Sequence, residues 1–335
     1  MRFSPQHGSG AMSPVTMSAK TIAGADVGKF FLDVAIEPGG RTFRVPNNVE
    51  GVTRIVQRLQ QHQVTRLVLE AVGYYGILLS RTAAAAGIDV NIVKPNRVKG
   101  LREAEGGLAK TDRLDAGLIA RFGLLMHENL RPLPSAEAMR LRALSTRRRQ
   151  LCEMIAMEKT RLKQAFDADL AQSCRDMIKT LEDQRTAIQG EIDASLEAKE
   201  DQRVRRDLLR SIPGVGPVIA ATLIVDLPEL GTIDRKAIAS LAGVAPHIAQ
   251  SGRLPGKAHI RGGRPCVRVA LYLAALSAVR CDGGFKARYQ AMKAAGKPSK
   301  VALIAIARQI VVVANTMLKD GRAYAPVDAA SGRAP

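Results

Sequence analysis

The chain has 335 residues, of which 46% are hydrophobic, and its 50 Lys and Arg against 31 Asp and Glu give a formal charge of +19. This length predicts two or three domains, and the hydrophobic content excludes a disordered chain. The charge favours a polyphosphate partner over a membrane surface, since no apolar run approaches the roughly 20 residues of a spanning helix. Four scattered cysteines without a CxxC pair, and a start without a signal-peptide core, favour a cytoplasmic protein.

Residues 1–19 are polar and we expect them to be a disordered extension, whereas residues 20–130 alternate between strand and helix patterns. The expected strands are Thr21–Val27, Phe30–Ile36, Thr42–Val45, Arg66–Glu70 and Asp89–Val93, and the expected helices are Val49–Gln61, Tyr75–Ala86, Asn96–Glu105 and Asp112–Leu125. This is the element order of an RNase H-like sheet. A doubly wound nucleotide-binding fold is the structural alternative, but no glycine-rich phosphate fingerprint follows the first strand.

Four carboxylates of this domain occupy unusual positions. Asp26 interrupts the first apolar strand and Glu70 ends the fourth, where unpaired acids are costly to bury. Asp112 and Asp115 are three residues apart on the last helix and so share one face. Two divalent ions, held by such acids roughly 3.5–4 Å apart, can stabilise both oxygens of a phosphoryl displacement. The four acids therefore predict a site for two divalent metal ions.

Residues 131–206 contain long runs rich in Arg, Glu, Gln, Leu and Ala, with apolar residues at intervals of seven and four. They predict two long helices that form an antiparallel coiled-coil hairpin turning near Asp167–Ser173, with Phe166 on the apolar seam. The hairpin could be a spacer or a dimerisation arm. The run Arg147, Arg148 and Arg149 could contact phosphate or be a solvated face.

Residues 207–320 are expected to form a mainly helical domain, with helices Cys266–Val279 and Lys300–Leu318, before a disordered tail at 321–335. Near its start, Gly214 and Gly216 resemble the turn of a helix-hairpin-helix, in which backbone N–H groups bind a phosphate. An ordinary helix-loop-helix is the alternative. Ser251 lies in a glycine-rich loop, where it could cap a turn or sit among cations that stabilise a phosphoryl transition state. The cations of this loop are Arg253, Lys257, Arg261, Arg264 and Arg268.

Taken in order, these motifs resemble the DEDD-motif insertion-sequence transposases, now described as bridge-RNA-guided recombinases. The resemblance runs from about Thr21 to Asp320. It rests on Asp-Val-Gly-Lys at 26–29, Leu-Glu-Ala at 69–71, Lys-Thr-Asp-Arg-Leu-Asp-Ala at 110–116, Pro-Gly-Val-Gly at 213–216, Gly-Val-Ala-Pro at 243–246, Ser-Gly at 251–252 and Gly-Gly-Arg at 262–264. Val72 departs from the family, which often has a small polar residue there.

The resemblance implies a RuvC-like nuclease domain and a separate domain that bears a nucleophilic serine. It implies that Ser251 becomes linked to DNA, that Mg²⁺ is held by Asp26, Glu70, Asp112 and Asp115, and that the acids and the serine of one site come from different protomers of a tetramer. A structured bridge RNA would pair with donor and target DNA, while the protein reads shape and backbone. The expected nucleic-acid contacts are Lys29, Lys110, Arg147, Arg148, Arg149, Gly214, Gly216, Arg253, Lys257, Arg261, Arg264 and Arg268.

Two other functions compete with this one. In a metal-dependent nuclease of the Holliday-junction type, water would attack the phosphorus and Ser251 would be structural. In a non-catalytic nucleic-acid scaffold, the four acids would serve no purpose in a protein that is otherwise cationic.

Overall fold

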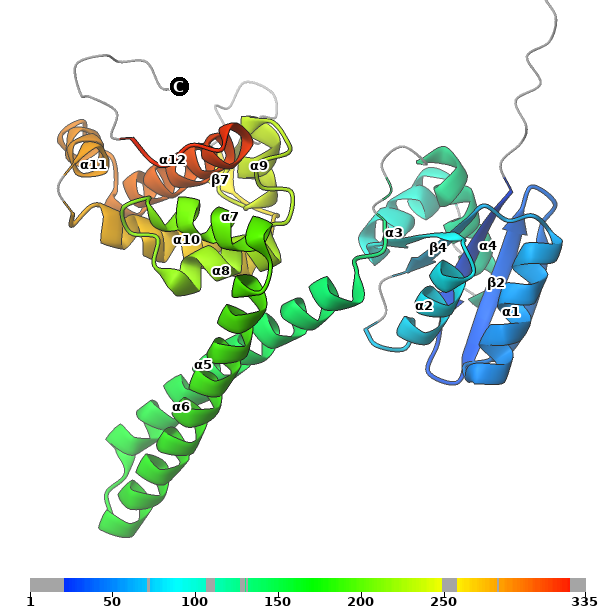
Figure 1. Cartoon of the computed structure of the whole chain (residues 1–335), viewed down its shortest axis with the longest axis horizontal. Helices are drawn as coiled ribbons and strands as arrows, with labels where there is room; N and C mark the ends of the chain where they lie inside the picture. The colour runs from blue at the N-terminus through cyan, green and yellow to red at the C-terminus, as the bar shows by residue number, and fades with distance from the viewer. Residues whose placement is uncertain are drawn as a thin grey trace, which may run out of the picture. The chain divides into compact units, whose positions relative to one another are not determined.

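The computed structural model describes residues 21–70, 73–106, 112–126, 130, 132–248, 258–281 and 283–325, without the side chains of residues 112–114, 248 and 258. The chain forms two compact units, Met1–Pro134 and Ser135–Pro335, drawn in Figure 1. The expected disordered extension at 1–19, residues 326–335 of the expected tail, Lys110 and the loop with Ser251 lie outside the described residues.

The N-terminal unit is built on a mixed five-stranded sheet with the strand order β3-β2-β1-β4-β5. Strands β1, β2 and β3 pair antiparallel, and β1, β4 and β5 pair parallel. This order and these directions are consistent with the predicted RNase H-like sheet. The strands are β1 Ile22–Val27, β2 Phe31–Glu37, β3 Arg41–Pro46, β4 Arg66–Glu70 and β5 Asp89–Val93.

Helices cover both faces of this sheet, as Figure 1 shows. Helices α1 Val49–Gln61 and α2 Ile77–Ala85 pack on one face, against Ala23, Ala25 and Leu69. Helices α3 Pro95–Ala104 and α4 Asp112–Leu125 cover the other, against Ile22 and Val68. Because successive strand residues point to opposite faces, the residues between the buried alanines of β1 face α4.

Helix α4 lies directly on β1 because Gly24 has no side chain. A Cβ atom at Gly24 would lie 2.2 Å from the backbone N of Ala120 and 2.5 Å from the backbone O of Ala116. Gly123, a turn further along α4, has the same function toward β4, since its Cβ would lie 2.7 Å from a methyl of Val68. The two glycines therefore set the spacing between helix and sheet.

The C-terminal unit begins with two long helices, α5 Ala136–Gln164 and α6 Ala168–Glu197, which pack side by side. Leu151, Ile155 and Leu181 form a small core between them. The chain turns at residues 165–167, before the expected position. Phe166 is 94% exposed, so its expected place on the apolar seam is wrong: α5 has already ended and the ring points into solvent.

The remaining helices of this unit enclose one large apolar core. They are α7 Glu200–Arg210, α8 Pro217–Asp226, α9 Arg235–Leu241, α10 Pro265–Ala278, α11 Gly284–Ala294 and α12 Ser299–Asp320. Helix α12 is long and apolar enough to cross a membrane, so the expectation that no apolar run reaches that length is wrong. Half of its apolar window is buried in the protein, with Ile306, Ala307, Ile310 and Val311 inside the core, which explains its composition.

The contact at Gly24 is testable by a single added methyl group. We expect Gly24→Ala to reduce the free energy of unfolding by about 3 kcal/mol or more, because the methyl would overlap backbone atoms of α4. Gly100→Ala, on α3, should be neutral or stabilise by up to about 1 kcal/mol, since nothing lies near its Cβ position. Urea unfolding measures both, and equal stability of the two variants would contradict the account.

Candidate active site

Three acids form one row across the face of the sheet that α4 covers. Asp26 of β1 is the register partner of Asp33 of β2. Glu70 follows Leu69 of β4, and Leu69 pairs with Ala25, so Glu70 is the neighbour of Asp26 on the parallel strand. Residues in register on adjacent strands point to the same face. Asp26 and Glu70, which the sequence predicted as site residues, are therefore brought together by the strand order.

The first turn of α4 reaches the same edge of the sheet. Along α4, Gly123 lies against Ile22, where β1 begins, and Ala116 and Ala120 lie against Gly24. The helix thus runs opposite to β1, and its start at Asp112 lies one turn beyond Ala116, toward the end of the strand that carries Asp26. The backbone of Asp112 is accordingly placed at the carboxyl ends of β1 and β4, as the sequence pattern requires.

Asp115 is held by a cation that the sequence did not reveal. Its carboxylate forms an ion pair with the guanidinium of Arg102, from the last turn of α3, and both side chains are largely buried. Arg102 neutralises and orients this acid. The two residues are thirteen positions apart, so no helical spacing in the sequence indicates the pair.

Asp33 is a second residue that sequence reasoning missed, although an acid within an apolar strand is the same signal that singled out Asp26. Asp33 is 4% exposed and lies beside Asp26. Arg44 of β3 binds it in two-pronged fashion, with Nε 3.0 Å from both carboxylate oxygens and Nη2 2.8 Å from Oδ2. Such paired geometry offsets the cost of burying the charge.

The donor set at this edge suits a hard divalent cation, because it consists of carboxylate oxygens. Among the residues whose side chains are described, no group of three or more Asp, Glu, His or Cys converges closely enough to hold an ion. The side chain of Asp112 is outside that set, and Asp115 is engaged by Arg102. The backbone arrangement therefore fits a metal site formed by Asp26, Glu70 and the first turn of α4.

Ser251 belongs to the connection of a small β-hairpin in the C-terminal unit. Strands β6 Pro246–Ile248 and β7 Ala258–Ile260 pair antiparallel, with His247 opposite His259. Residues 249–257 between them, which include Ser251, Arg253 and Lys257, are outside the described residues. The sequence predicted a glycine-rich loop here but not the strands that carry it.

The base of this hairpin is held by a close backbone contact. A Cβ at Gly263 would lie 2.3 Å from the backbone N of Gly243, and both glycines have positive φ angles, of 65° and 74°. Only glycine allows this approach in this conformation. Arg268 donates to the carbonyl of Gly262 at 2.9 Å, and the backbone N of Arg264 donates to Leu241 at 2.9 Å.

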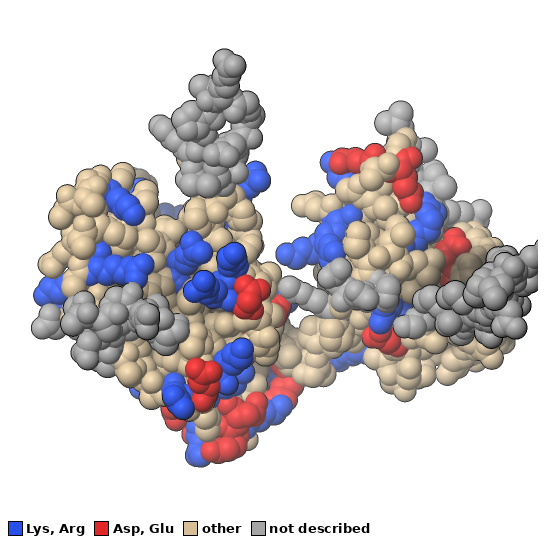
Figure 2. Space-filling model, turned by 90° about the horizontal axis from the view of Figure 1, so that it is seen from above, with Lys and Arg blue, Asp and Glu red and all other residues tan. Residues whose placement is uncertain are grey.

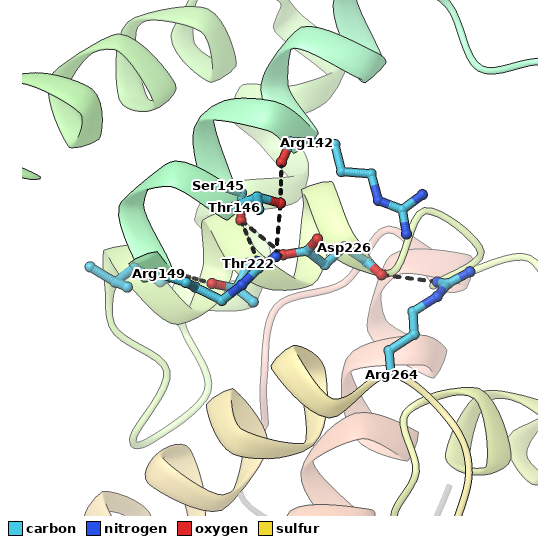
Figure 3. Close-up of polar contacts among 8 residues, drawn as sticks. Arg142, Ser145, Thr146, Arg149, Thr222, Asp226 and Arg264 are labelled. Atoms are coloured by element: carbon cyan, nitrogen blue, oxygen red, sulfur yellow. Dashed lines mark hydrogen bonds and ion pairs between the residues drawn. The ribbon is translucent and has the colours of Figure 1, made fainter. Parts of the chain in front are cut away.

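Arg264 also anchors the hairpin through its side chain. The guanidinium binds both carboxylate oxygens of Glu229, at 2.5 and 2.7 Å, and the backbone carbonyl of Asp226 at 3.0 Å. Figure 3 shows Arg264 reaching the end of α8 in this way. The sequence predicted Arg264 and Arg268 as nucleic-acid contacts, whereas their nearest partners in the structure are internal. Arg261 is exposed and free of such internal bonds among the described residues.

A buried polar group links α5 to α8 at the same place. The carboxylate of Asp226 accepts bonds of 2.9 Å from Ser145 Oγ and from Arg149 Nη1, as Figure 3 shows. Asp226 and Ser145 are both buried. Of the predicted run on α5, Arg149 is therefore used internally, Arg148 is half-buried and Arg147 is exposed.

The two predicted phosphate-binding glycines differ in their surroundings. Gly214 has a φ of 86°, and its Cβ would lie 2.3 Å from the carbonyl O of Ala274, so it allows α10 to pack closely. Gly216 caps α8 and has open space around it. Lys29 is exposed near the acid row, with its ammonium 5.0 Å from the centre of the Phe30 ring. Figure 2 shows basic side chains spread over the displayed face of the C-terminal unit, with fewer acidic ones among them.

Two family models match this chain. One, described as "Transposase" and carrying the DEDD designation, matches residues 23–168, and the other, "Transposase IS116/IS110/IS902 family", matches residues 206–290. The two matches cover parts of both units and include all four acids and Ser251.

Similar proteins include the pilin gene-inverting protein of Moraxella lacunata, 26% identical over 91% of this chain and 98% of that protein. An uncharacterized 43.6 kDa protein of insertion element IS110 from Streptomyces coelicolor is 34% identical over 45% of this chain and 37% of its own length. The solved structure "T. thermophilus RuvC in complex with Holliday junction substrate" matches 34% of this chain and 99% of its own, at 17% identity and a TM-score of 0.27.

The internal role of Arg264 predicts an effect on stability. In a double-mutant cycle, Arg264→Ala and Glu229→Gln should show a coupling free energy of about 2 kcal/mol in urea unfolding, because the pair is two-pronged and largely buried. The exposed pair of Arg54 and Glu50 is the control and should couple far more weakly.

The salt dependence of DNA binding separates basic residues that contact phosphate from basic residues with internal partners. Exposed Arg261→Ala should reduce the slope of log K against log salt for duplex DNA by about 0.9, the effect of one lost phosphate contact. Arg264→Ala should leave the slope unchanged. A lower slope for Arg264→Ala at unchanged stability would instead make it a phosphate contact.

Proposed function

Because the chain belongs to the IS110 family of transposases, enzymes that act on DNA, we propose that it cuts and rejoins DNA with four metal-binding acids and a nucleophilic serine. Asp26, Glu70, Asp112 and Asp115 would hold Mg²⁺, and Ser251 would attack the DNA backbone. The observation that carries the proposal is the meeting of Asp26, Glu70 and the start of α4 at one edge of the sheet.

The acids supply the chemistry of the nuclease half of this site. Bound Mg²⁺ would polarise the scissile phosphate and neutralise charge on the leaving oxygen. Asp26 and Glu70 are fixed by the sheet, and Asp112 and Asp115 by the packing of α4 against Gly24. In this arrangement Arg102 orients Asp115 and would release or share one of its oxygens when an ion binds.

The serine would supply the nucleophile, which holds the cut strand until it is rejoined. Ser251 Oγ would attack phosphorus and lose its proton, while the bond from phosphorus to one deoxyribose oxygen breaks and that oxygen gains a proton. Attack by a hydroxyl of another strand would reverse the step and free the serine. A strand can thus be exchanged without loss of the phosphodiester bond energy. In this proposal the serine and the acids of one site come from different protomers of an oligomer.

The choice of site would lie in a structured bridge RNA that pairs with donor and target DNA. A charge of +19 supports binding to both nucleic acids through their backbones. The name of the Moraxella lacunata relative, a pilin gene-inverting protein, supports recombination rather than cleavage alone. The water-attacking nuclease remains the alternative and needs no serine.

Replacing the acids should abolish cleavage but not binding. Asp26→Asn, Glu70→Gln, Asp112→Asn and Asp115→Asn should each lower Mg²⁺-dependent strand cleavage by a factor of about 10² or more, a loss typical of removing an electrostatic contact to the transition state. Removing negative charge cannot weaken attraction to phosphate, so DNA affinity should be unchanged or higher. The control is Asp89→Asn, at the opposite end of the sheet. Wild-type cleavage by both Asp112→Asn and Asp115→Asn would refute the metal site.

Ser251 decides between recombinase and nuclease. The wild type with Mg²⁺, RNA and nicked suicide DNA should form a protein–DNA adduct that survives denaturing gels, and mass spectrometry should find the linked phosphate on Ser251. Ser251→Ala should lose the adduct and strand exchange yet still bind DNA. Cleavage without an adduct by both proteins would favour water as the nucleophile.

A further inference from the structure

Exposed aromatic rings gather at the edge of the sheet that carries the acids. The chain has only 7 Phe, 5 Tyr and no Trp. Among the described residues, the exposed large aromatic side chains are Phe30, Phe31, Tyr74 and Phe166. Phe30 and Tyr74, which are 68% and 70% exposed, lie in two neighbouring turns, and Phe31 begins β2 directly after the first turn. We call Phe30, Phe31, Tyr74 and Tyr75 the aromatic edge.

The two turns are fastened to each other by one side chain. Asn47 Nδ2 donates to the carbonyl of Gly28 at 2.8 Å, in the turn that bears Phe30, and to the carbonyl of Tyr75 at 3.1 Å. The backbone N of Asn47 also donates to the carbonyl of Phe30 at 2.8 Å. The rings are therefore presented by a fixed backbone, which lowers the entropic cost of binding a partner.

This edge continues the row of acids. The turn with Phe30 follows β1 one residue after its end, and Tyr74 follows Glu70 by four residues. Phe31 precedes Asp33 by two residues on β2 and so points to the same face as the acids. Whatever reaches Asp26 and Glu70 at the end of the sheet consequently passes close to these rings.

Cations accompany the rings. Lys29 lies 5.0 Å from the centre of the Phe30 ring, and the guanidinium of Arg44 lies 5.6 Å from that of Phe31. The rings of Tyr74 and Tyr75 are 4.4 Å apart, and their hydrogen bond raises the pKa of Tyr75 above its usual value. Rings beside cations are the elements with which proteins bind unpaired bases, the ring stacking on the base and the cation meeting the backbone.

We propose that the aromatic edge binds unpaired bases of the nucleic-acid strand that is cut at the acids. The inference rests on the proposed function for its location, but the stacking surface itself needs no metal. A second copy of the chain is the less suitable occupant, since Lys29 beside the rings and a charge of +19 would oppose its approach. Base stacking also explains why costly apolar surface is left in water here.

The test compares two DNA probes with the full chain in the absence of divalent metal. One is a duplex with unpaired bases in a central bulge, one of them 2-aminopurine, and the other is the fully paired duplex of equal length. We expect the wild type to prefer the bulged probe and to quench its fluorescence. Phe30→Leu combined with Tyr74→Leu should reduce the affinity for the bulged probe about tenfold or more and leave the paired duplex unaffected, because stacking is lost but charge is not.

Two further variants and one further measurement make the result specific. Phe30→Tyr with Tyr74→Phe should retain the preference, since the rings remain. Leu125→Ala removes an equally exposed apolar side chain at the other end of α4 and should behave as the wild type. The slope of affinity against salt for the leucine variant should match the wild type.

Other outcomes overturn the proposal. Unchanged bulge binding by the leucine variant, or an equal loss for both probes, would mean that the rings do not contact bases. If the leucine variant formed a smaller oligomer but lost no preference for the bulged probe, the aromatic edge would instead bind a second copy of the chain. Asp26→Asn separates this test from the proposed function: wild-type cleavage by that variant would refute the metal site, whereas the bulge preference is measured without cleavage.

Discussion

The backbone contact between α4 and β1 at Gly24 fixes the relation of helix to sheet, and the geometry of the acid site depends on it. With no Cβ at that position, Ala116 and Ala120 sit directly on the strand. Their helix then begins beside the end of the strand, where Asp26 and Glu70 are neighbours on parallel strands. A larger residue would move Asp112 and Asp115 away from the two acids of the sheet, although none of the four had changed.

Charge pairing has a different purpose at the two candidate sites. In the N-terminal unit, Arg44 and Arg102 hold the carboxylates Asp33 and Asp115 beside the proposed metal position. In the C-terminal unit, Arg149 and Arg264 hold α5 and the base of the β6–β7 hairpin against the end of α8. Buried charges of this kind are costly unless they are paired, so these contacts restrict the backbone to one arrangement.

The strands and helices of the N-terminal unit could be predicted to within two residues, because their apolar periodicity and turn residues agree. The strand order also predicted that Asp26 and Glu70 meet. The sequence could not show that Arg264, which it predicts as a nucleic-acid contact, pairs with the internal carboxylate of Glu229. Gly214 likewise resembles part of a phosphate-binding turn, but in the structure α10 packs against the position that its side chain would occupy. Such contacts join residues far apart in the chain and leave no local pattern.

The proposed chemistry depends most on the binding of divalent metal by the four acids together. A crystal of the protein soaked in Mn²⁺, examined by anomalous scattering, tests that claim without any assumption about RNA or serine. The account predicts anomalous density between Asp26, Glu70 and the first turn of α4, and its loss in Asp26→Asn. Density elsewhere, or none at this edge at Mn²⁺ concentrations that support DNA cleavage, would contradict it.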